Sequence, residues 1–215
     1  MAGPPFLDRA DAGRQLADRL AHLEDCEVVV FGLPGGGVPV AAEVARRLGA
    51  PLDVVLVRKV GVPGHRELAM GAIAEHGVQV RNTEIITRAG ISTETWVSAE
   101  RREREALQAR AQRLAAHRPG AAVEGLTAIV IDDGVATGAT AVAAIEAVRA
   151  RGAAHVILAA PVAPPDVGDV VTGADEVVCV ATPEDFRAVG LWYRSFPSVD
   201  DSEVIAILDE AAARD

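Results

Sequence analysis

The chain has 215 residues, of which half are hydrophobic, 3% are aromatic and two are cysteine. This length and apolar content suit one domain with a sizeable core, and two cysteines are too few for a disulfide framework or a zinc site. The 31 acidic residues outnumber the 21 basic ones, and the resulting net charge of −10 argues against broad binding to nucleic acid or to an anionic membrane.

No targeting or membrane-spanning segment is predicted. Residues 1–11 are acidic and contain proline, without the cationic and apolar regions of a secretory signal. The longest apolar stretch, residues 28–42, is interrupted by prolines and by three glycines, so it cannot form an uninterrupted membrane helix. We therefore expect a cytoplasmic protein, which also agrees with the few cysteines.

Short apolar runs alternate with helical patterns along the chain. The runs that predict buried strands are residues 27–31, 53–57, 128–131, 155–159 and 176–180. The helical patterns cover residues 8–23, 38–48 and 139–151. The last two end at Gly49 and Gly152, where a helix stop favours a left-handed residue. This alternation predicts an α/β fold, with a central, mostly parallel sheet flanked by helices.

The first predicted strand leads into Pro34, Gly35, Gly36 and Gly37 before a helix begins. Three consecutive glycines are costly in conformational entropy, which indicates that backbone amides wrap closely around a ligand. The alternative interpretation is a tight turn that lets a helix pack closely.

Arg58 and Lys59 follow the second predicted strand, and a stretch rich in Gly and Pro, residues 60–71, comes next. A basic pair at the carboxyl end of a strand points into the crevice where open α/β sheets bind ligands. Taken alone, such a pair is more often surface charge. His65 and Arg66 are weaker candidates for the same site, since a loop histidine is usually exposed to solvent.

Residues 92–117 break the alternation. They are rich in Arg, Glu and Gln, and they predict an inserted, mostly solvated helix with Ser92 or Thr93 as its cap.

The C-terminal part, from residue 183, contains Phe186, Trp192, Tyr193 and Phe196 in an irregular stretch before a last helix from about Asp200. Aromatic residues concentrated in this way indicate a pocket for a flat ligand or a subunit contact, or else a small satellite core.

The strongest functional signal lies in residues 128–140, where a buried strand ends in Asp132 and Asp133 before a loop of small and hydroxyl residues opens a helix. Unpaired amides and the positive end of the helix dipole suit a phosphate group in this loop. The two carboxylates would repel that phosphate, so they are expected to accept hydrogen bonds from hydroxyls of the same ligand or to hold magnesium. The alternative is an Asx turn that only caps the helix.

A ligand with a phosphate at one end and neighbouring hydroxyls beside it is a ribose 5-phosphate. Residues 128–140 resemble the signature of the type I phosphoribosyltransferases. The resemblance implies transfer of the 5-phosphoribosyl group from 5-phosphoribosyl-1-pyrophosphate to a nitrogenous base, with a purine-like acceptor favoured, and release of pyrophosphate. It also implies Mg²⁺ as the cofactor. Strings typical of dinucleotide-binding folds or of P-loops do not occur.

The resemblance also assigns expected roles to residues. Asp132 and Asp133 would bind the ribose hydroxyls and, directly or indirectly, magnesium, while Arg58 and Lys59 would supply positive charge to the pyrophosphate. The expected 5-phosphate loop is Gly134, Val135, Ala136, Thr137, Gly138, Ala139 and Thr140. The expected pyrophosphate loop is Pro34, Gly35, Gly36 and Gly37, although relatives often carry a basic residue where this chain has Gly35 or Gly36. Residues 60–71 would form a mobile loop that closes over the site.

Residues 183–193 resemble, more loosely, the hood of hypoxanthine-type members. This likeness implies that Phe186 and Trp192 stack on the base and that Asp185 makes a polar contact. Residues 1–215 are then expected to form one domain, with an insert at about 92–117 and a hood at about 181–215. A homodimer is one expected assembly, because relatives are commonly dimers.

Two other functions share these motifs. A binding module with the same fold would sense the donor or a nucleotide without turnover, and the absence of a basic residue at Gly35–Gly37 favours it. A pyrophosphokinase that makes the donor would share the loop of acids and threonines, but the chain is short and has no evident ATP motif. The expected partners are the donor and an unidentified base, with no nucleic acid and no membrane.

Overall fold

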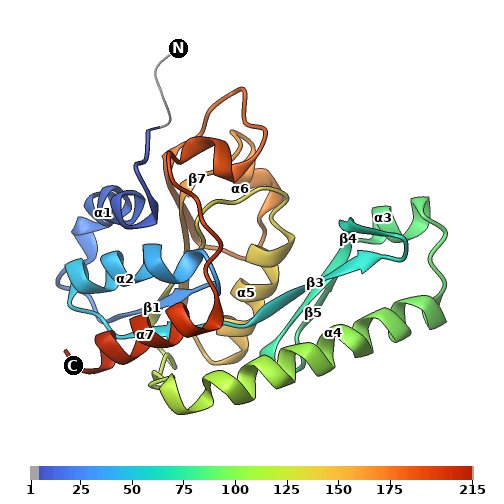
Figure 1. Cartoon of the computed structure of the whole chain (residues 1–215), viewed down its shortest axis with the longest axis horizontal. Helices are drawn as coiled ribbons and strands as arrows, with labels where there is room; N and C mark the ends of the chain where they lie inside the picture. Colours follow the sequence, from blue (N-terminus) through green and yellow to red (C-terminus); the bar gives the residue numbers. More distant parts are fainter. Residues whose placement is uncertain (1–4, 215) are drawn as a thin grey trace.

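A five-stranded parallel sheet forms the centre of the molecule, in the order β2-β1-β6-β7-β8 (Figure 1). The computed structural model describes residues 5–214, apart from the side chains of Arg66 and Glu67. The five strands are β1 (Val28–Gly32), β2 (Leu52–Val54), β6 (Thr127–Ile131), β7 (His155–Val162) and β8 (Glu176–Ala181). The predicted α/β fold with a parallel sheet is confirmed.

Helices cover both faces of this sheet, which is why its strands are almost continuously apolar. The helices α1 (Arg9–Arg19), α2 (Gly37–Leu48) and α7 (Asp201–Ala212) lie on one face, and α5 (Ala139–Ala150) lies on the other (Figure 1). Alternate residues of one strand enter the two cores: Val28 and Val30 join the first, and Val29 and Phe31 the second. A short helix, α6 (Val167–Val170), follows β7.

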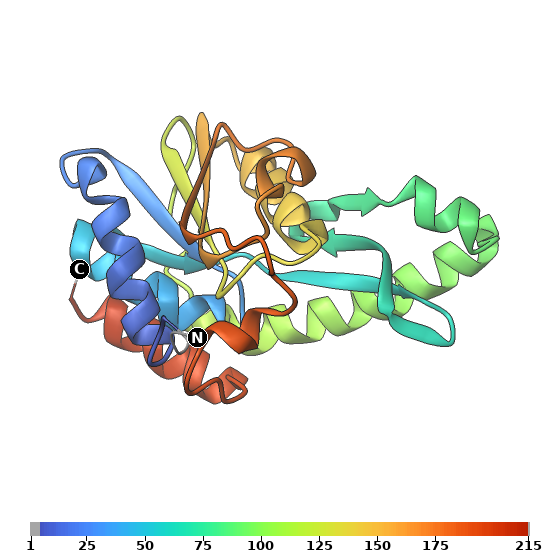
Figure 2. The same cartoon turned by 90° about the horizontal axis from the view of Figure 1, so that it is seen from above.

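An arm extends from one end of the sheet (Figures 1 and 2). It consists of a three-stranded antiparallel sheet, β3 (Val57–Val62), β4 (His65–Ala74) and β5 (Gln79–Arg81), with the helices α3 (Thr83–Arg88) and α4 (Thr93–Leu114). Ser92 caps α4 by accepting a hydrogen bond from the backbone N–H of Thr95 at 3.2 Å. A 3₁₀ turn over residues 115–117 continues the helix, so the predicted insert at 92–117 is confirmed in extent.

The arm corrects two expectations about residues 53–71. The expected strand at 53–57 is divided, because β2 ends at Val54 and β3 begins at Val57 in the second sheet. Residues 60–71 form paired strands of a hairpin instead of an irregular loop, and their closure over the site stays a prediction.

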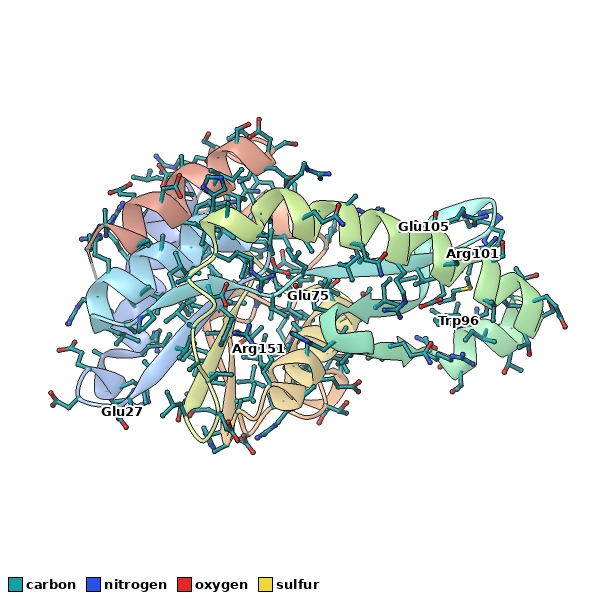
Figure 3. All side chains as sticks on the ribbon, turned by 90° about the horizontal axis from the view of Figure 1, so that it is seen from below. Glu27, Glu75, Trp96, Arg101, Glu105 and Arg151 are labelled. Carbon is teal, nitrogen blue, oxygen red and sulfur yellow. The ribbon has the colours of Figure 1, made fainter. Side chains whose placement is uncertain are left out.

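The inserted helix is mostly exposed or half-buried, as expected, but four of its 22 residues are buried on one side. Trp96 and Leu107 on its inner side are buried, and the guanidinium of Arg81 lies over the Trp96 ring at 4.8 Å. Figure 3 shows Trp96 on the side of α4 that faces the strands of the arm.

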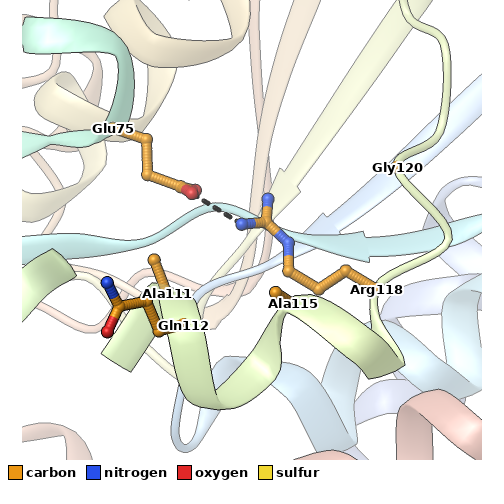
Figure 4. Close-up of a pocket in the computed structure, with 6 residues that line it drawn as sticks. All are labelled: Glu75, Ala111, Gln112, Ala115, Arg118 and Gly120. Atoms are coloured by element: carbon orange, nitrogen blue, oxygen red, sulfur yellow. Dashed lines mark hydrogen bonds and ion pairs between the residues drawn. The ribbon is translucent and has the colours of Figure 1, made fainter. Parts of the chain in front are cut away.

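A buried charge network ties the arm to the central sheet. Asp53 is fully buried, and its carboxylate accepts from Arg118 Nε at 3.2 Å and from Arg151 at 3.1 Å. Arg118 also donates to Glu75 Oε1 at 2.6 Å, beside an open hollow of about 440 Å³ (Figure 4). Because β2, the end of β4 and the chain after α4 meet here, the network holds the root of the arm.

Helix boundaries follow local capping chemistry at several places. Asp8 accepts from the N–H of Asp11 at the start of α1, and Asp200 accepts from the first turn of α7. Gly49 takes the left-handed conformation, with φ of 60°, at the end of α2. Within residues 5–214, no helix combines the length and the apolar character that crossing a bilayer would demand.

Candidate active site

The candidate site lies where the strand order changes direction. The connection after β1 leads to β2 on one side of β1, while β6 pairs with β1 on the other side. Ligands of open α/β sheets bind at such a switch point, outside the carboxyl ends of the strands. The two loops predicted to bind ligand follow β1 and β6, so the topology brings them side by side. The N–H of Leu33 donates to the carbonyl of Ile131 at 2.8 Å between them.

The loop after β6 offers free backbone donors. The N–H of Val135 is occupied, since it donates to the carbonyl of Val162 at 2.9 Å. In contrast, the N–H groups of residues 136–140 meet no protein acceptor within residues 5–214. Gly138, the N-cap of α5, has a φ of 73°, which a residue with a side chain rarely adopts. The loop thus presents unpaired amides at the positive end of a helix, which is an arrangement that binds phosphate.

Asp132 and Asp133 lie at the entrance of this loop, and each has one carboxylate oxygen bound by the protein. Asp132 Oδ1 accepts from the N–H of Asp133 at 2.9 Å. Asp133 Oδ2 accepts from Arg9 Nε at 2.8 Å. Burial, and next the charge of Asp133, raise the pKa of Asp132 above its ordinary value. Burial also raises the pKa of Asp133, against the opposing effect of the hydrogen bond from Arg9.

The glycine loop after β1 packs directly against the acid pair. A Cβ atom on Gly36 would overlap Asp133 Oδ2, and one on Gly37 would lie 2.5 Å from the carbonyl oxygen of Ile131. On Gly35, a Cβ would lie 2.5 Å from the carbonyl oxygen of Val199. Close packing within the protein therefore explains the three glycines, as the alternative interpretation of a tight turn requires. Within the described residues, the N–H groups of Gly35 and Gly36 still lack a protein acceptor.

A cation from the inserted helix reaches the glycine loop. Arg110 of α4 donates to the carbonyl of Pro34 at 3.2 Å, and its guanidinium pairs with Asp201 of α7. The loop itself has no basic residue, but the fold supplies a positive charge beside it.

Lys59 and Arg58 occupy different places. Lys59 lines a cleft of about 290 Å³ together with both acids, while Arg58 binds Glu103 of α4 at 2.6 Å. Arg58 and Lys59 also line a second hollow, of about 500 Å³, between the β3–β4 hairpin and α4. Lys59 alone of the two also lines the smaller cleft, since consecutive residues of a strand point to opposite sides. The remaining lining of the smaller cleft comprises Gly134, Val135, Ala136, Thr137, Gly138, Thr140, Ala141, Val189 and Phe196.

The three residues predicted to contact the base, Asp185, Phe186 and Trp192, do not lie together at the site. Phe186 and Trp192 are half-buried against a small satellite core that contains Phe6 and Tyr193. Asp185 is exposed. None of the three lines the smaller cleft, whereas Phe196 does. The arrangement of Phe186 and Trp192 agrees with the satellite-core alternative.

The weaker candidates are not brought to the acid pair by any described contact. His65 is exposed at the start of β4, and the side chain of Arg66 lies outside the described residues.

Sequence reasoning missed Arg9, Tyr193 and Phe196 as site residues. Arg9 is the first residue of α1, where a positive charge opposes the helix dipole. This unfavourable placement is a sequence feature that could have marked Arg9 as a site residue. Tyr193 donates its hydroxyl to the carbonyl of Asp133 at 2.5 Å. Phe196 was visible only as one of several clustered aromatics.

The acid pair is not part of a larger cluster of metal-ligating side chains in the described part of the chain. Within the described residues, no three His, Cys, Asp or Glu side chains gather as metal ligands. One carboxylate oxygen of each acid already accepts a hydrogen bond from the protein, and the positively charged guanidinium of Arg9 lies against Asp133. A magnesium ion would therefore need most of its oxygen ligands from a substrate.

Comparisons with known proteins concern the family and the fold of the chain. A family model described as "Phosphoribosyl transferase domain" matches residues 7–189. A Mycobacterium tuberculosis protein named "Putative phosphoribosyl transferase Rv0571c" is 52% identical over 207 residues, which are 96% of this chain and 47% of that protein. The chain thus spans about half the length of the curated relative that it matches.

Solved structures show the same fold. The crystal structure of TT1426 from Thermus thermophilus has a TM-score of 0.80 and 45% identity, and the match covers 95% of this chain and 98% of that one. A hypoxanthine phosphoribosyltransferase from Staphylococcus aureus has a TM-score of 0.50 and 14% identity, with 88% and 83% covered. The second likeness, at this low identity, concerns the fold alone.

Proposed function

The chain belongs to the phosphoribosyl transferase domain family, and from this premise we propose that it transfers a 5-phosphoribosyl group from 5-phosphoribosyl-1-pyrophosphate to a nitrogen of a base. Pyrophosphate is the leaving group. One observation carries this proposal: the acid pair lines the same cleft as residues 136–138 and Thr140, whose amides are free. A ligand held there at both ends needs a phosphate at one end and hydroxyls at the other.

Binding of the donor follows from these contacts. The N–H groups of residues 136–140 would bind the 5-phosphate, with the dipole of α5 adding to the attraction. Asp132 and Asp133, which line the same cleft, would accept hydrogen bonds from the 2- and 3-hydroxyls of the ribose. Together the two anchors would fix the anomeric carbon relative to the acceptor, which lowers the entropic part of the barrier.

Charge would favour the reaction itself. Transfer passes through a ribose with positive charge at its anomeric carbon, and the buried acid pair lies beside that ring. Lys59, which lines the same cleft, would neutralise charge that develops on the leaving pyrophosphate. Arg58 would join it only by releasing Glu103, which holds its guanidinium at 2.6 Å.

Magnesium fits this proposal as part of the substrate. The acid pair alone offers too few free oxygen ligands for a resident ion. A magnesium ion bound by the pyrophosphate oxygens would bring its own ligands and would reduce the charge of the leaving group.

The acceptor is proposed to be a flat nitrogenous base, with a purine-like ring favoured. Phe196 supports this, because its ring is 37% exposed and lines the cleft beside the acid pair. The Arg9 guanidinium lies 3.8 Å above the ring centroid and Tyr193 packs at 4.8 Å, so the ring is held in place. A fixed aromatic face is suited to stacking against a heterocycle.

A second candidate function is a sensor that binds the donor or a nucleotide without turnover. Close packing within the protein accounts for all three glycines at 35–37, so that loop gives less support to pyrophosphate binding than its composition suggests. A donor-forming pyrophosphokinase is less favoured, since the chain is short and contains no evident ATP motif. As to its surroundings, we propose a cytoplasmic protein that uses no nucleic acid or membrane, and that forms a homodimer.

The test is to incubate the protein with the donor, magnesium and a panel of purine and pyrimidine bases, and to follow pyrophosphate release. Release that depends on one base supports the enzyme. Tight donor binding without release for any base supports the sensor. The absence of donor binding would remove both. In Asp133→Asn, donor use is expected to fall at least about tenfold, since a hydrogen bond to a charged group contributes about 1.5–3 kcal/mol.

A further inference from the structure

Arg9 makes three contacts that converge on the acid pair. Its side chain is 10% exposed, and its Nε donates to Asp133 Oδ2 at 2.8 Å. A second nitrogen donates to the carbonyl of Pro197 at 2.6 Å, and the guanidinium plane covers the Phe196 ring. Arg9 precedes Asp133 by 124 residues, so only the fold brings them together.

Backbone contacts between residues 6–7 and residues 192–195 hold Arg9 in this position. Phe6 pairs with Tyr193 in a parallel β-bridge, and the N–H of Arg194 donates to the carbonyl of Phe6 at 2.9 Å. The N–H of Ser195 donates to the carbonyl of Leu7 at 3.0 Å. Tyr193 in turn donates to the backbone carbonyl of Asp133. The N-terminal segment and residues 193–197 therefore hold Asp133 jointly, Arg9 by its side chain and Tyr193 by its backbone carbonyl.

Arg9 does not stabilise the helix α1 to which it belongs. A cation in the first turn of α1 opposes the helix dipole, and burial of a guanidinium costs free energy unless it is well paired. Arg14, on the same helix, is 53% exposed and makes only long ion pairs, at 3.7 and 3.9 Å. The placement of Arg9 is explained by what it binds, not by helix stability.

The contact with Arg9 decides which oxygens of the acid pair are left for a ligand. Asp132 Oδ1 and Asp133 Oδ2 are bound by the protein. Apart from a hydrogen bond between the two carboxyl groups themselves, no N–H or O–H group within residues 5–214 donates to Asp132 Oδ2 or Asp133 Oδ1. Two neighbouring carboxylates with one free oxygen each match the two neighbouring hydroxyls of a ribose.

We propose that Arg9 is a positioning residue: it binds Asp133 Oδ2 and so directs Asp133 Oδ1 to the ribose hydroxyls of the donor. The inference rests on the proposed function, because it assumes that the acid pair binds ribose. It adds that the N-terminal helix and residues 193–197 set the geometry of the acid pair, through a residue that does not itself touch the sugar.

The test measures binding of ribose 5-phosphate and of the donor by calorimetry, without magnesium for the sugar phosphate. Arg9→Ala is expected to weaken both by about tenfold, as the loss of one charge-assisted contact predicts. Asp133→Asn should weaken them by at least as much, and the double variant should lose no more than Asp133→Asn alone. Arg14→Ala, on the same helix, is the matched control and should bind as the unaltered protein does.

Two further measurements separate positioning from a merely structural role. Guanidinium ion at millimolar concentration should restore binding to Arg9→Ala, whereas sodium chloride at the same ionic strength should not. Arg9→Lys keeps the charge with one donor group, so its affinity should lie between those of the unaltered protein and Arg9→Ala. If Arg9→Ala fails to fold, the affinity of Arg9→Lys is the measurement that tests the proposal.

The outcomes distinguish the two proposals. If the unaltered protein binds neither ribose 5-phosphate nor the donor, the proposed function and this inference both fall. If it binds both while Arg9→Ala and Arg9→Lys bind equally well or more tightly, only the role of Arg9 is overturned. Additive losses in the double variant would also overturn it.

Discussion

The carboxylate of Asp133 fills the space that a side chain on Gly36 would need. A Cβ atom on Gly36 would overlap Asp133 Oδ2 and would lie 2.7 Å from Arg9 Nε. The loop after β1 and the loop after β6 are therefore fitted to each other, with the Arg9 guanidinium between them. Position 36 must be glycine to leave room for the carboxylate of Asp133, whether or not a ligand also approaches this loop.

Gly36→Ala is expected to displace the carboxylate of Asp133 and to reduce donor affinity by about tenfold or more, because a charge-assisted hydrogen bond is broken or distorted. Donor binding by calorimetry measures the effect. Gly168→Ala is the control, since a Cβ there meets no atom within 4 Å. Equal donor affinity in the two variants would contradict the close fit at Gly36.

Lys59→Ala is expected to lower kcat/KM for the donor more than Arg58→Ala does. Lys59 lines the cleft with the acids, whereas Arg58 is held by Glu103 on the arm. A difference of about tenfold, or about 1.4 kcal/mol, is expected from steady-state pyrophosphate release. Arg101→Ala, an exposed cation on α4, controls for the change in net charge. A larger loss of kcat/KM in Arg58→Ala would contradict this prediction and would place the pyrophosphate in the hollow beside α4.

Phe196→Ala is expected to raise KM for the acceptor base by about tenfold, and by more than it raises KM for the donor, since base–aromatic stacking contributes about 1–3 kcal/mol. Initial rates at saturating donor measure the effect. Leu191→Ala is the control, because Leu191 lies in the same segment and is 64% exposed. An unchanged acceptor KM would remove Phe196 from the base site.

Asp53→Asn is expected to destabilise the fold by about 3–5 kcal/mol, because it leaves the buried guanidinium groups of Arg118 and Arg151 without their shared anion. Urea unfolding measures the free energy. Asp209→Asn removes an exposed pair with His117 and is expected to cost less than about 1 kcal/mol. A similar small loss in both variants would show that the network does not hold the root of the arm.

Asp201 predicts a pH dependence of stability. Burial raises its pKa, but the hydrogen bonds from Arg113 and Arg110 outweigh this and lower the pKa below its ordinary value. The unfolded chain therefore binds the proton more readily, so the contribution of Asp201 is present above an unfolded pKa of about 3.9 and is lost as the pH falls through the folded value. In urea unfolding, Asp201→Asn should be less stable than the unaltered protein at pH 7, and the difference should shrink towards pH 3. A constant difference would contradict the prediction.

Much of the central sheet could be predicted from local patterns. Apolar runs at 128–131 and 155–159 became β6 and β7, because short segments that are buried on both faces are typical of strands in a parallel sheet. The Gly/Pro stretch at 60–71 predicts a loop, since Gly61, Pro63 and Gly64 are typical of one, but these residues form a hairpin. Register shifts at Val60–Val62 accommodate Gly61, and Trp96 of α4 packs so closely on Gly71 that no side chain fits there. Neither contact is visible in the local sequence.

The sequence by itself determined the strand–loop–helix motif at 128–140, its two acids and the parallel sheet that carries them. Apolar runs, glycine positions and helix starts can be recognised from residues that are close together along the chain. The tertiary structure alone decided which distant groups meet that motif: Arg9 on Asp133, Lys59 and Phe196 in the cleft, and Arg110 beside Pro34. These contacts join elements whose separation along the chain leaves no periodic pattern. They arise only when packing of the sheet, the arm and the two chain ends has fixed where each side chain lies.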